Sequence, residues 1–227
     1  MAKVLFTAVV ADMRNKLNGT VFSKNRYGAY TRTKVTPVNP QSTFQTAVRA
    51  NFGTTSASWR GLTQAQRNAW IAQAQFFPII DIFGNSKVLS GQALYQQLNR
   101  NLFTAGQSAI TTPPSPAAIP SFYATAFVSS AGGADTITVS AATVPAGHTC
   151  IVAVTAQLTP GIQFAKNRFR VLGTFTATAT AIVITTAYRA RFGTPVVGNK
   201  ILVKVYLIDN TTGQASTPSE VSTIVIA

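Results

Sequence analysis

Side chains able to carry out acid–base or nucleophilic chemistry are few in this chain. Its 227 residues include five Asp+Glu, one His and one Cys. A glycosidase needs two carboxylates held across the bond that it breaks. The acids of this chain are scattered, and no two of them share a local motif: Asp12, Asp81, Asp135, Asp209 and Glu220. We therefore expect no carboxylate-based active site and no enzyme activity.

His148 and Cys150 form the one pair whose spacing could suit a metal or a nucleophile. Two residues apart on a strand, their side chains lie on the same face. A zinc site needs further ligands, and the chain holds no other His or Cys. A Cys–His nucleophile would also need an orienting acid, and none lies nearby in the sequence. We expect a buried Cys150, a His148 at the edge of a turn, and neither metal nor cofactor.

The stretch GTPVVGNK, residues 193–200, nearly matches a phosphate-binding P-loop. In that motif Lys directly follows the second Gly, and Ser or Thr follows the Lys. Here Asn199 stands before Lys200 and Ile201 follows it, inside a β-rich stretch. The lysine would miss the phosphates, and no hydroxyl would hold magnesium. The segment therefore predicts a loop that leads into a strand.

A cationic stretch with aromatic residues is the remaining candidate site. GTVFSKNRYGAYTRTK, residues 19–34, carries four bases, two tyrosines and no acid. Such a stretch could contact phosphates or an acidic protein surface, or it could be a solvated face that aids solubility. No zinc finger, RRM signature or basic leucine zipper accompanies it, which disfavours sequence-specific DNA binding. The predicted residues for binding an anionic partner are Lys24, Arg26, Tyr27, Tyr30, Arg32 and Lys34 of this stretch, with Arg49, Arg60 and Arg67 on helices.

The chain is strongly basic although its charged residues are scarce. Nineteen Lys+Arg against five Asp+Glu give +14, yet charged residues make up 11% of the chain, where about 25% is usual. A surface so poor in charge is typical of a chain partly covered by neighbours, and we expect a homo-oligomer. One cysteine excludes an intrachain disulfide, which fits assembly in a reducing cytoplasm. No segment approaches the roughly 20 apolar residues of a membrane span, so we expect no membrane partner.

Residues 1–106 predict a basic α+β anchoring domain. The apolar run 4–11 is short for a secretory signal and charges follow it at once, so we expect a first strand and no secretion. Two β-rich runs predict a hairpin that turns through Asn25 and Gly28. About three helices should follow, over residues 42–61, 63–77 and 90–105, because Ser and Thr capping signals precede apolar positions of helical spacing. Phe44, Val48 and Phe52 should share one face of the first helix.

Residues 107–120 predict an extended, Pro-rich linker, with prolines at 113, 114, 116 and 120. Twelve bases and two acids precede residue 113, whereas seven bases and three acids follow it. The basic character therefore belongs mainly to the first domain.

Residues 121–227 have the rhythm of an all-β domain. Six to seven β-rich runs are separated by Gly, Pro, Asn or Asp, among them DTITVS, CIVAVTAQL, FRVLGTFT, AIVITTAY, KILVKVYLID and VSTIVIA. This spacing favours an immunoglobulin-like or fibronectin type III-like sandwich. The tail KILVKVYLIDNTTGQASTPS predicts a final hairpin that turns at Asn210 and Gly213.

Three stretches of the first domain together resemble a known family: GTVFSKNRYGAYTRTKVTPVNPQSTFQTAVRANF, SWRGLTQAQRNAWIAQA and LSGQALYQQLNRNL. The family comprises virion structural proteins of tailed bacteriophages and prophages. Its features are a GTVFS hairpin, TPVNPQ, a helix with Trp, Leu-Thr, Gln-Arg and Trp, and often a C-terminal sandwich. The resemblance implies a virion component made in the host cytoplasm, with major capsid or tail proteins as partners.

Within a virion we expect a capsid decoration or auxiliary protein that docks on the shell through the basic first domain. Two alternatives remain open, a tail or head–tail junction component and a virion protein that contacts nucleic acid non-specifically. The hairpin tyrosines would supply rigid contact area, and the bases would complement an acidic shell.

Overall fold

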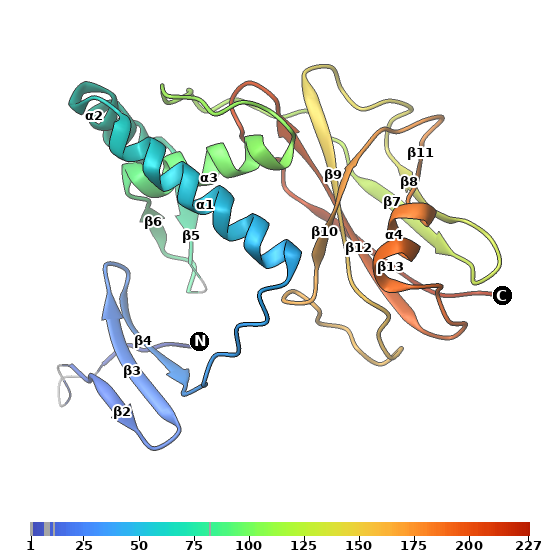
Figure 1. The fold of residues 1–227 in the computed structure, drawn as a ribbon, viewed down its shortest axis with the longest axis horizontal. Helices are drawn as coiled ribbons and strands as arrows, with labels where there is room; N and C mark the ends of the chain where they lie inside the picture. The colour runs from blue at the N-terminus through green and yellow to red at the C-terminus, as the bar shows by residue number, and fades with distance from the viewer. Residues whose placement is uncertain (1, 7–9, 11, 82) are drawn as a thin grey trace. The chain divides into compact units, whose positions relative to one another are not determined.

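The computed structural model describes residues 2–6, 10, 12–81 and 83–227, and the chain forms two compact units. One contains Met1–Arg49 and Ile79–Lys87, and the other contains Ala50–Pro78 and Val88–Ala227. Helices and antiparallel sheets occur together, which confirms the mixed α+β class in general terms (Figure 1). This division differs from the expected boundaries 1–106, 107–120 and 121–227, because the helix 91–104 packs with a C-terminal sheet and the helix 64–73 packs with that helix. That residues 107–120 separate independently folding domains stays a prediction.

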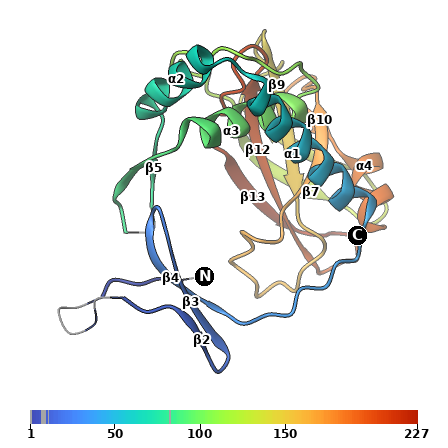
Figure 2. The same cartoon turned by 60° about the vertical axis from the view of Figure 1, so that its left-hand side comes forward.

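The N-terminal unit is built on a four-stranded antiparallel sheet. Its strands follow the order β1-β4-β3-β2, with bounds β1 Ala2–Lys3, β2 Asn15–Leu17, β3 Thr20–Asn25 and β4 Gly28–Thr33. The predicted hairpin is β3–β4, and β2 lies beside β3 (Figure 2). In its turn, Asn25 Oδ1 accepts the N–H of Tyr27 at 2.9 Å, and Gly28 has a φ of +108°. The turn residues therefore act as the sequence predicted.

The N-terminal edge of this sheet departs from the expected first strand. Residues 4–6 and 10 are not in a strand, and the rest of the run, at 7–9 and 11, lies outside the described residues. The edge strand is instead β1, where Lys3 pairs with Tyr30. A two-stranded sheet of β5 (Pro78–Ile80) and β6 (Ser86–Val88) adds Asp81, whose Oδ2 accepts from Lys3 Nζ at 2.6 Å.

The three predicted helices are all present. They are α1 (Thr43–Gly61), α2 (Gln64–Gln73), which continues into the short 3-10 helix η1 (Ala74–Phe76), and α3 (Gly91–Thr104). A capping box between Thr63 and Gln66 begins α2, as expected. The Ser90 hydroxyl accepts from Ala93 N at 3.2 Å and begins α3. The α3 stripe is buried, with Leu94, Leu98 and Leu102 at 0 to 2% exposure.

The apolar face of α1 is arranged differently from that of α3. Phe44, Val48 and Phe52 are 63%, 57% and 57% exposed. The helix packs through its C-terminal half, where Thr55 is buried and the Trp59 ring lies 5.4 Å from that of Tyr95. Helical spacing places side chains on one face, but a neighbouring element must cover that face before it becomes core.

Two antiparallel sheets make up the C-terminal part. Their strand orders are β10-β9-β12-β13 and β11-β8-β7, and their bounds are β7 Ala124–Ser129, β8 Asp135–Val139, β9 His148–Val154, β10 Arg170–Phe175, β11 Ala181–Val183, β12 Lys200–Asp209 and β13 Ser219–Ile224. Buried residues of both sheets form one hydrophobic cluster, which includes Ile137, Val152 and Val203. The stretch AIVITTAY is only in part a strand, because α4 (Thr185–Phe192) begins after β11 and buries Tyr188.

Helix α3 and the C-terminal sheets pack together inside the second unit. Ala105 clusters with Ile151 of β9 and Ile208 of β12. Asn101 Nδ2 donates to the backbone oxygen of Gly213 at 2.8 Å, which joins α3 to the turn after β12. This contact explains why the unit boundary does not follow the Pro-rich segment.

The segment 107–120 has neither helix nor strand, in keeping with its prolines. It is nevertheless tied to its neighbours by side-chain hydrogen bonds. Trp70 Nε1 donates to Thr111 O at 2.8 Å. Gln214 donates to Ser115 O at 2.8 Å and accepts from Ala117 N at 3.0 Å. These bonds attach the segment to α2 and to the turn after β12.

Candidate functional site: a cationic face of the N-terminal sheet

The register of the N-terminal sheet brings bases from different strands together. Lys16 of β2 pairs with Val21 of β3, which pairs with Arg32 of β4, so the two bases lie in one row across three strands. Neighbouring strands are about 4.8 Å apart, which places the Cα atoms of Lys16 and Arg32 roughly 10 Å apart. The next row on the same face, two residues further along, holds Ser23 and Tyr30. Since side chains alternate along a strand, Tyr30 and Arg32 share a face.

These side chains line an open cavity of about 320 Å³. Its lining contains four bases and no acid: Arg14, Asn15, Lys16, Val21, Phe22, Ser23, Lys24, Tyr30 and Arg32. Arg14 pairs with the exposed Asp12 at 2.9 Å. No ion pair within the described residues involves Lys16, Lys24 or Arg32. A concave face with several unneutralised cations attracts phosphates or carboxylates, and the attraction weakens with added salt.

Six of the nine predicted partner-binding residues belong to the hairpin region. Lys24, Tyr30 and Arg32 line the cavity. Arg26 and Tyr27 occupy the turn between β3 and β4. Lys34 follows β4 and is exposed.

The three predicted helical bases do not form one group. Arg49 belongs to the N-terminal unit, where its Nη1 donates to Asn39 Oδ1 at 2.8 Å. Arg60 and Arg67 belong to the other unit, and Arg67 Nη2 donates to Arg60 O at 2.6 Å. The guanidinium of Arg67 therefore has a structural role at the junction of α1 and α2.

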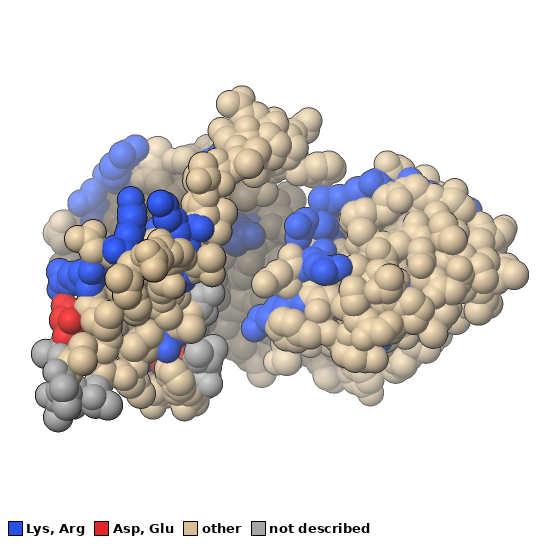
Figure 3. Space-filling model, turned by 90° about the horizontal axis from the view of Figure 1, so that it is seen from below, with Lys and Arg blue, Asp and Glu red and all other residues tan. Residues whose placement is uncertain are grey.

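Two bases of the cavity were not among the predicted residues. Arg14 and Lys16 precede the hairpin, in a stretch without a recognisable strand pattern. Their signal was the i, i+2 spacing of bases just before a β-hairpin, which places both on one face if a third strand forms. Figure 3 shows how blue Lys and Arg atoms prevail over red Asp and Glu atoms in the N-terminal unit.

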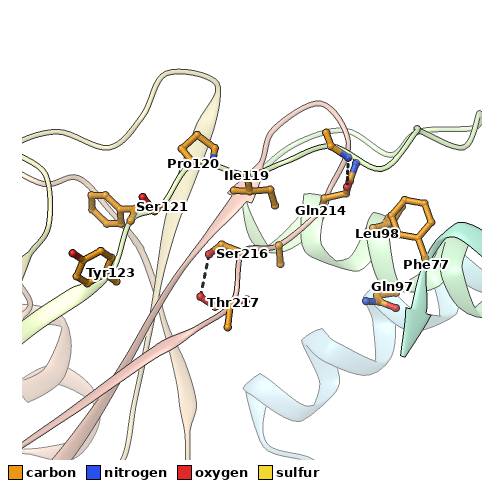
Figure 4. Close-up of a pocket in the computed structure, with 13 residues that line it drawn as sticks. Phe77, Gln97, Leu98, Ile119, Pro120, Ser121, Tyr123, Gln214, Ser216 and Thr217 are labelled. Atoms are coloured by element: carbon orange, nitrogen blue, oxygen red, sulfur yellow. Dashed lines mark hydrogen bonds between the residues drawn. The ribbon is translucent and has the colours of Figure 1, made fainter. Parts of the chain in front are cut away.

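A second cavity lies in the C-terminal unit and is chemically neutral. It measures about 480 Å³ and has no charged side chain in its lining: Phe77, Gln97, Leu98, Ala117, Ile119, Pro120, Ser121, Phe122, Tyr123, Gln214, Ala215, Ser216 and Thr217. Figure 4 shows Gln214 engaged with the Pro-rich segment at its rim, while Tyr123, half-exposed, stands at the opposite end. None of the predicted site residues lines it, and within its lining Gln214 accepts from Ala117 N at 3.0 Å.

Cys150 and His148, the pair considered as a metal or nucleophile site, lie in the core and beside a turn. Cys150 is fully buried, and burial raises the pKa of its thiol to about 12, so it is not a thiolate at neutral pH. The His148 ring nitrogen Nδ1 lies 2.8 Å from Ala146 O, beside the turn that precedes β9. Within the described residues no three His, Cys, Asp or Glu side chains group together as metal ligands would.

Every acid of the chain has a defined partner. Asp12, Asp81, Asp135 and Glu220 form ion pairs with Arg14, Lys3, Arg189 and Lys204. Burial alone would raise the pKa of Asp209, but hydrogen bonds from Thr211 and Thr212 lower it overall. The acids therefore stabilise turns and element contacts.

None of the helices in the described ranges combines the length and the hydropathy that crossing a bilayer requires. Searches against family models, curated proteins and solved structures gave no match to this chain.

Proposed function

We propose that this chain is a non-enzymatic structural protein of a bacteriophage virion, a capsid decoration protein that docks on an acidic protein surface through its N-terminal unit. The observation that carries the proposal is the row Lys16–Val21–Arg32, within a cavity lined by four bases and no acid. Carboxylates of a partner would neutralise these bases, and Tyr30 beside them would supply rigid contact area. The resemblance of residues 1–106 to phage virion proteins gives the proposal its biological setting.

We further propose that the C-terminal sheets form a fibronectin type III-like sandwich. The support is a division of seven antiparallel strands into sheets of four and three with a shared core. The chain changes sheet between β8 and β9, between β10 and β11, and between β11 and β12. Such crossings are the Greek-key connections of immunoglobulin-like folds. Modules of this kind commonly bind or space, which suits an element that projects from a particle.

The docking proposal is tested on particles of a phage that encodes the chain. We compare the row variant, Lys16→Gln/Arg32→Gln, with a loop variant, Lys166→Gln/Arg168→Gln, which removes the same charge from the other unit. Particles are washed at rising ionic strength, and the retained protein is quantified. The row variant should leave the particle at lower salt than both the wild type and the loop variant. Fewer ion pairs would hold it to the shell, so less screening by salt would be enough to release it. Equal retention of all three proteins would contradict docking through this face.

The place of the chain in the particle is the second part of the test. Symmetry-resolved imaging of labelled particles should find many copies on the outer shell. A ring at one vertex would favour the tail or head–tail alternative. Density inside the shell would favour a protein that contacts the genome, which the same row of bases could also serve.

A further inference from the structure

The long connection between β9 and β10 is an ordered loop with its own small core. Leu158, Ala165 and Leu202 are buried together, and Ile162 and Phe169 pack against them. Backbone hydrogen bonds close two turns inside the loop, from Ile162 N to Thr159 O at 3.1 Å and from Arg168 N to Ala165 O at 2.8 Å. The loop therefore has a defined conformation, held by its own packing and hydrogen bonds.

This loop displays an exposed aromatic ring among bases. Phe164 is 77% exposed. Lys166, Arg168 and Arg170 follow it and are all exposed. Arg170 is held by its own loop, because Nη1 donates to Asn167 O at 3.1 Å and to Phe169 O at 2.9 Å. Within the described residues, Phe164 is not part of the small core of this loop.

Lys200 joins the same cluster from the start of β12. Its Nζ donates to Gln163 Oε1 at 3.0 Å, and its backbone pairs with Leu158 at the beginning of the loop. Four bases, Lys166, Arg168, Arg170 and Lys200, therefore belong to this loop or bond to it. We call these bases together with Phe164 the β9–β10 patch.

The positive charge of the β9–β10 patch is not neutralised by the protein. Asp135 and Glu220 are paired with Arg189 and Lys204, and Asp209 is bonded in its own turn. In the described part of the chain, no ion pair involves Lys166, Arg168, Arg170 or Lys200. Burial and then repulsion from Arg170 lower the pKa of the neighbouring Arg191, another sign of excess positive charge here.

We propose that the β9–β10 patch binds single-stranded nucleic acid. Backbone phosphates would lie along Lys166, Arg168 and Lys200, and an unstacked base would stack on the Phe164 ring. Proteins that bind single strands without sequence preference combine these two features, a cationic track and exposed aromatic rings. A duplex offers no free base face to the ring. An acidic protein could also contact the bases and the ring, so binding of an acidic peptide is the competing outcome of the test.

This inference goes beyond the docking function, which uses the other unit. It is tested on the full chain by fluorescence anisotropy with labelled oligothymidine and oligouridine of about 16 nucleotides. The comparison ligands are a duplex of the same length and a polyglutamate peptide. The two single strands separate DNA from RNA as the natural source, since the patch chemistry suits both.

Phe164→Ala should weaken binding of the single strands about tenfold, and Phe164→Trp should keep it, because a larger ring still stacks. The loop variant, Lys166→Gln/Arg168→Gln, should lower the slope of log affinity against log salt by about 1.4. The row variant of the N-terminal unit removes equal charge but leaves the β9–β10 patch intact. Phe164→Ala added to the row variant should therefore still weaken binding of the single strands about tenfold. All substituted side chains are exposed, so thermal unfolding should match that of the wild type and exclude misfolding.

Three results would overturn the proposal. One is equal loss of affinity in the row variant and the loop variant, which would mean that net charge alone drives binding. Another is binding of the duplex or of polyglutamate that is as tight as that of the single strands and as sensitive to Phe164. The third is unchanged affinity in Phe164→Ala.

Discussion

Single residues in this chain show how hydrogen bonding assigns a role to each of its scarce acids. Asp81 is the clearest case, because it accepts Lys3 Nζ at 2.6 Å and the N–H groups of Phe83 and Asn85 at 2.8 and 3.0 Å. The ammonium of Lys3, and then the backbone N–H groups, lower the pKa of this carboxyl from 3.8 to about 2. One acid thus joins the β1 edge of the sheet to the β5–β6 hairpin.

The lowered pKa of Asp81 predicts a pH dependence of the stability of the N-terminal unit. Its contribution should be fully present above pH 3.8 and should be lost as the pH falls through about 2, because the protonated acid releases Lys3. Asp81→Asn keeps an oxygen for Phe83 and Asn85 but does not titrate. The thermal unfolding temperature, measured from neutral pH down to pH 2, should therefore fall more steeply in the wild type than in Asp81→Asn. Parallel pH curves for the two proteins would disprove the role of this pair.

The position of Gly213 predicts that adding one methyl group, in Gly213→Ala, strongly destabilises the second unit. Its φ is +71°, and an added Cβ would lie 2.3 Å from the carbonyl oxygen of Leu98 in α3. Gly198 is the matched control, with a φ of +86° and nothing within 4 Å of its Cβ position. Both alanine variants should lose about 1 kcal/mol from the left-handed conformation. Gly213→Ala should lose roughly 1–3 kcal/mol more, because α3 must move. Denaturant unfolding measures the difference, and equal losses would show that the contact with α3 yields freely.

At the scale of elements, local signals were readable in the sequence and tertiary ones were not. The Thr63–Gln66 box and the Asn25–Gly28 turn depend on a few neighbouring residues, and both formed as predicted. Helix α4 was missed because it directly follows the β-branched run AIVI at 181–184 and because Tyr188, its one buried side chain, does not belong to a stripe of apolar residues at helical spacing. The exposed face of α1 could not be foreseen either, since burial depends on elements distant in the sequence.

The capping box of α2 makes a prediction at this scale. The Thr63 side chain accepts from Gln66 N at 3.3 Å, and the Gln66 side chain accepts from Thr63 N at 2.9 Å. Thr63→Ala should destabilise the second unit by about 1 kcal/mol, and Thr63→Ser should keep most of the stability because the hydroxyl remains. Circular dichroism during denaturant unfolding reports both values. A Ser variant as weak as the Ala variant would mean that the Thr methyl group, and not the cap, matters.

At the scale of the whole molecule, the charge count placed the basic character mainly before residue 113, and it missed a second concentration after that point. Both cationic surfaces depend on pairing between distant residues. Lys16 and Arg32 meet through β-sheet register, and Lys200 reaches the β9–β10 loop through a bond to Gln163. Contacts between such distant residues could not be predicted from the sequence. The hairpin part of the first surface could be predicted, because its residues are close together in the chain.

The two compact units also predict where a protease will cut. Residues 34–42, between β4 and α1, have no helix or strand and are all exposed. The Pro-rich segment 107–120 is held by Trp70 Nε1 at Thr111 and by Gln214 at Ser115 and Ala117. Proteinase K should therefore cleave first within 34–42 and leave a stable fragment that contains α2, α3 and the C-terminal sheets, because cleavage requires local opening of the backbone. Gln214→Ala removes two of the bonds to the Pro-rich segment and should add a second cut there. First cleavage of the wild type within 107–120 would instead support a linker between separate domains.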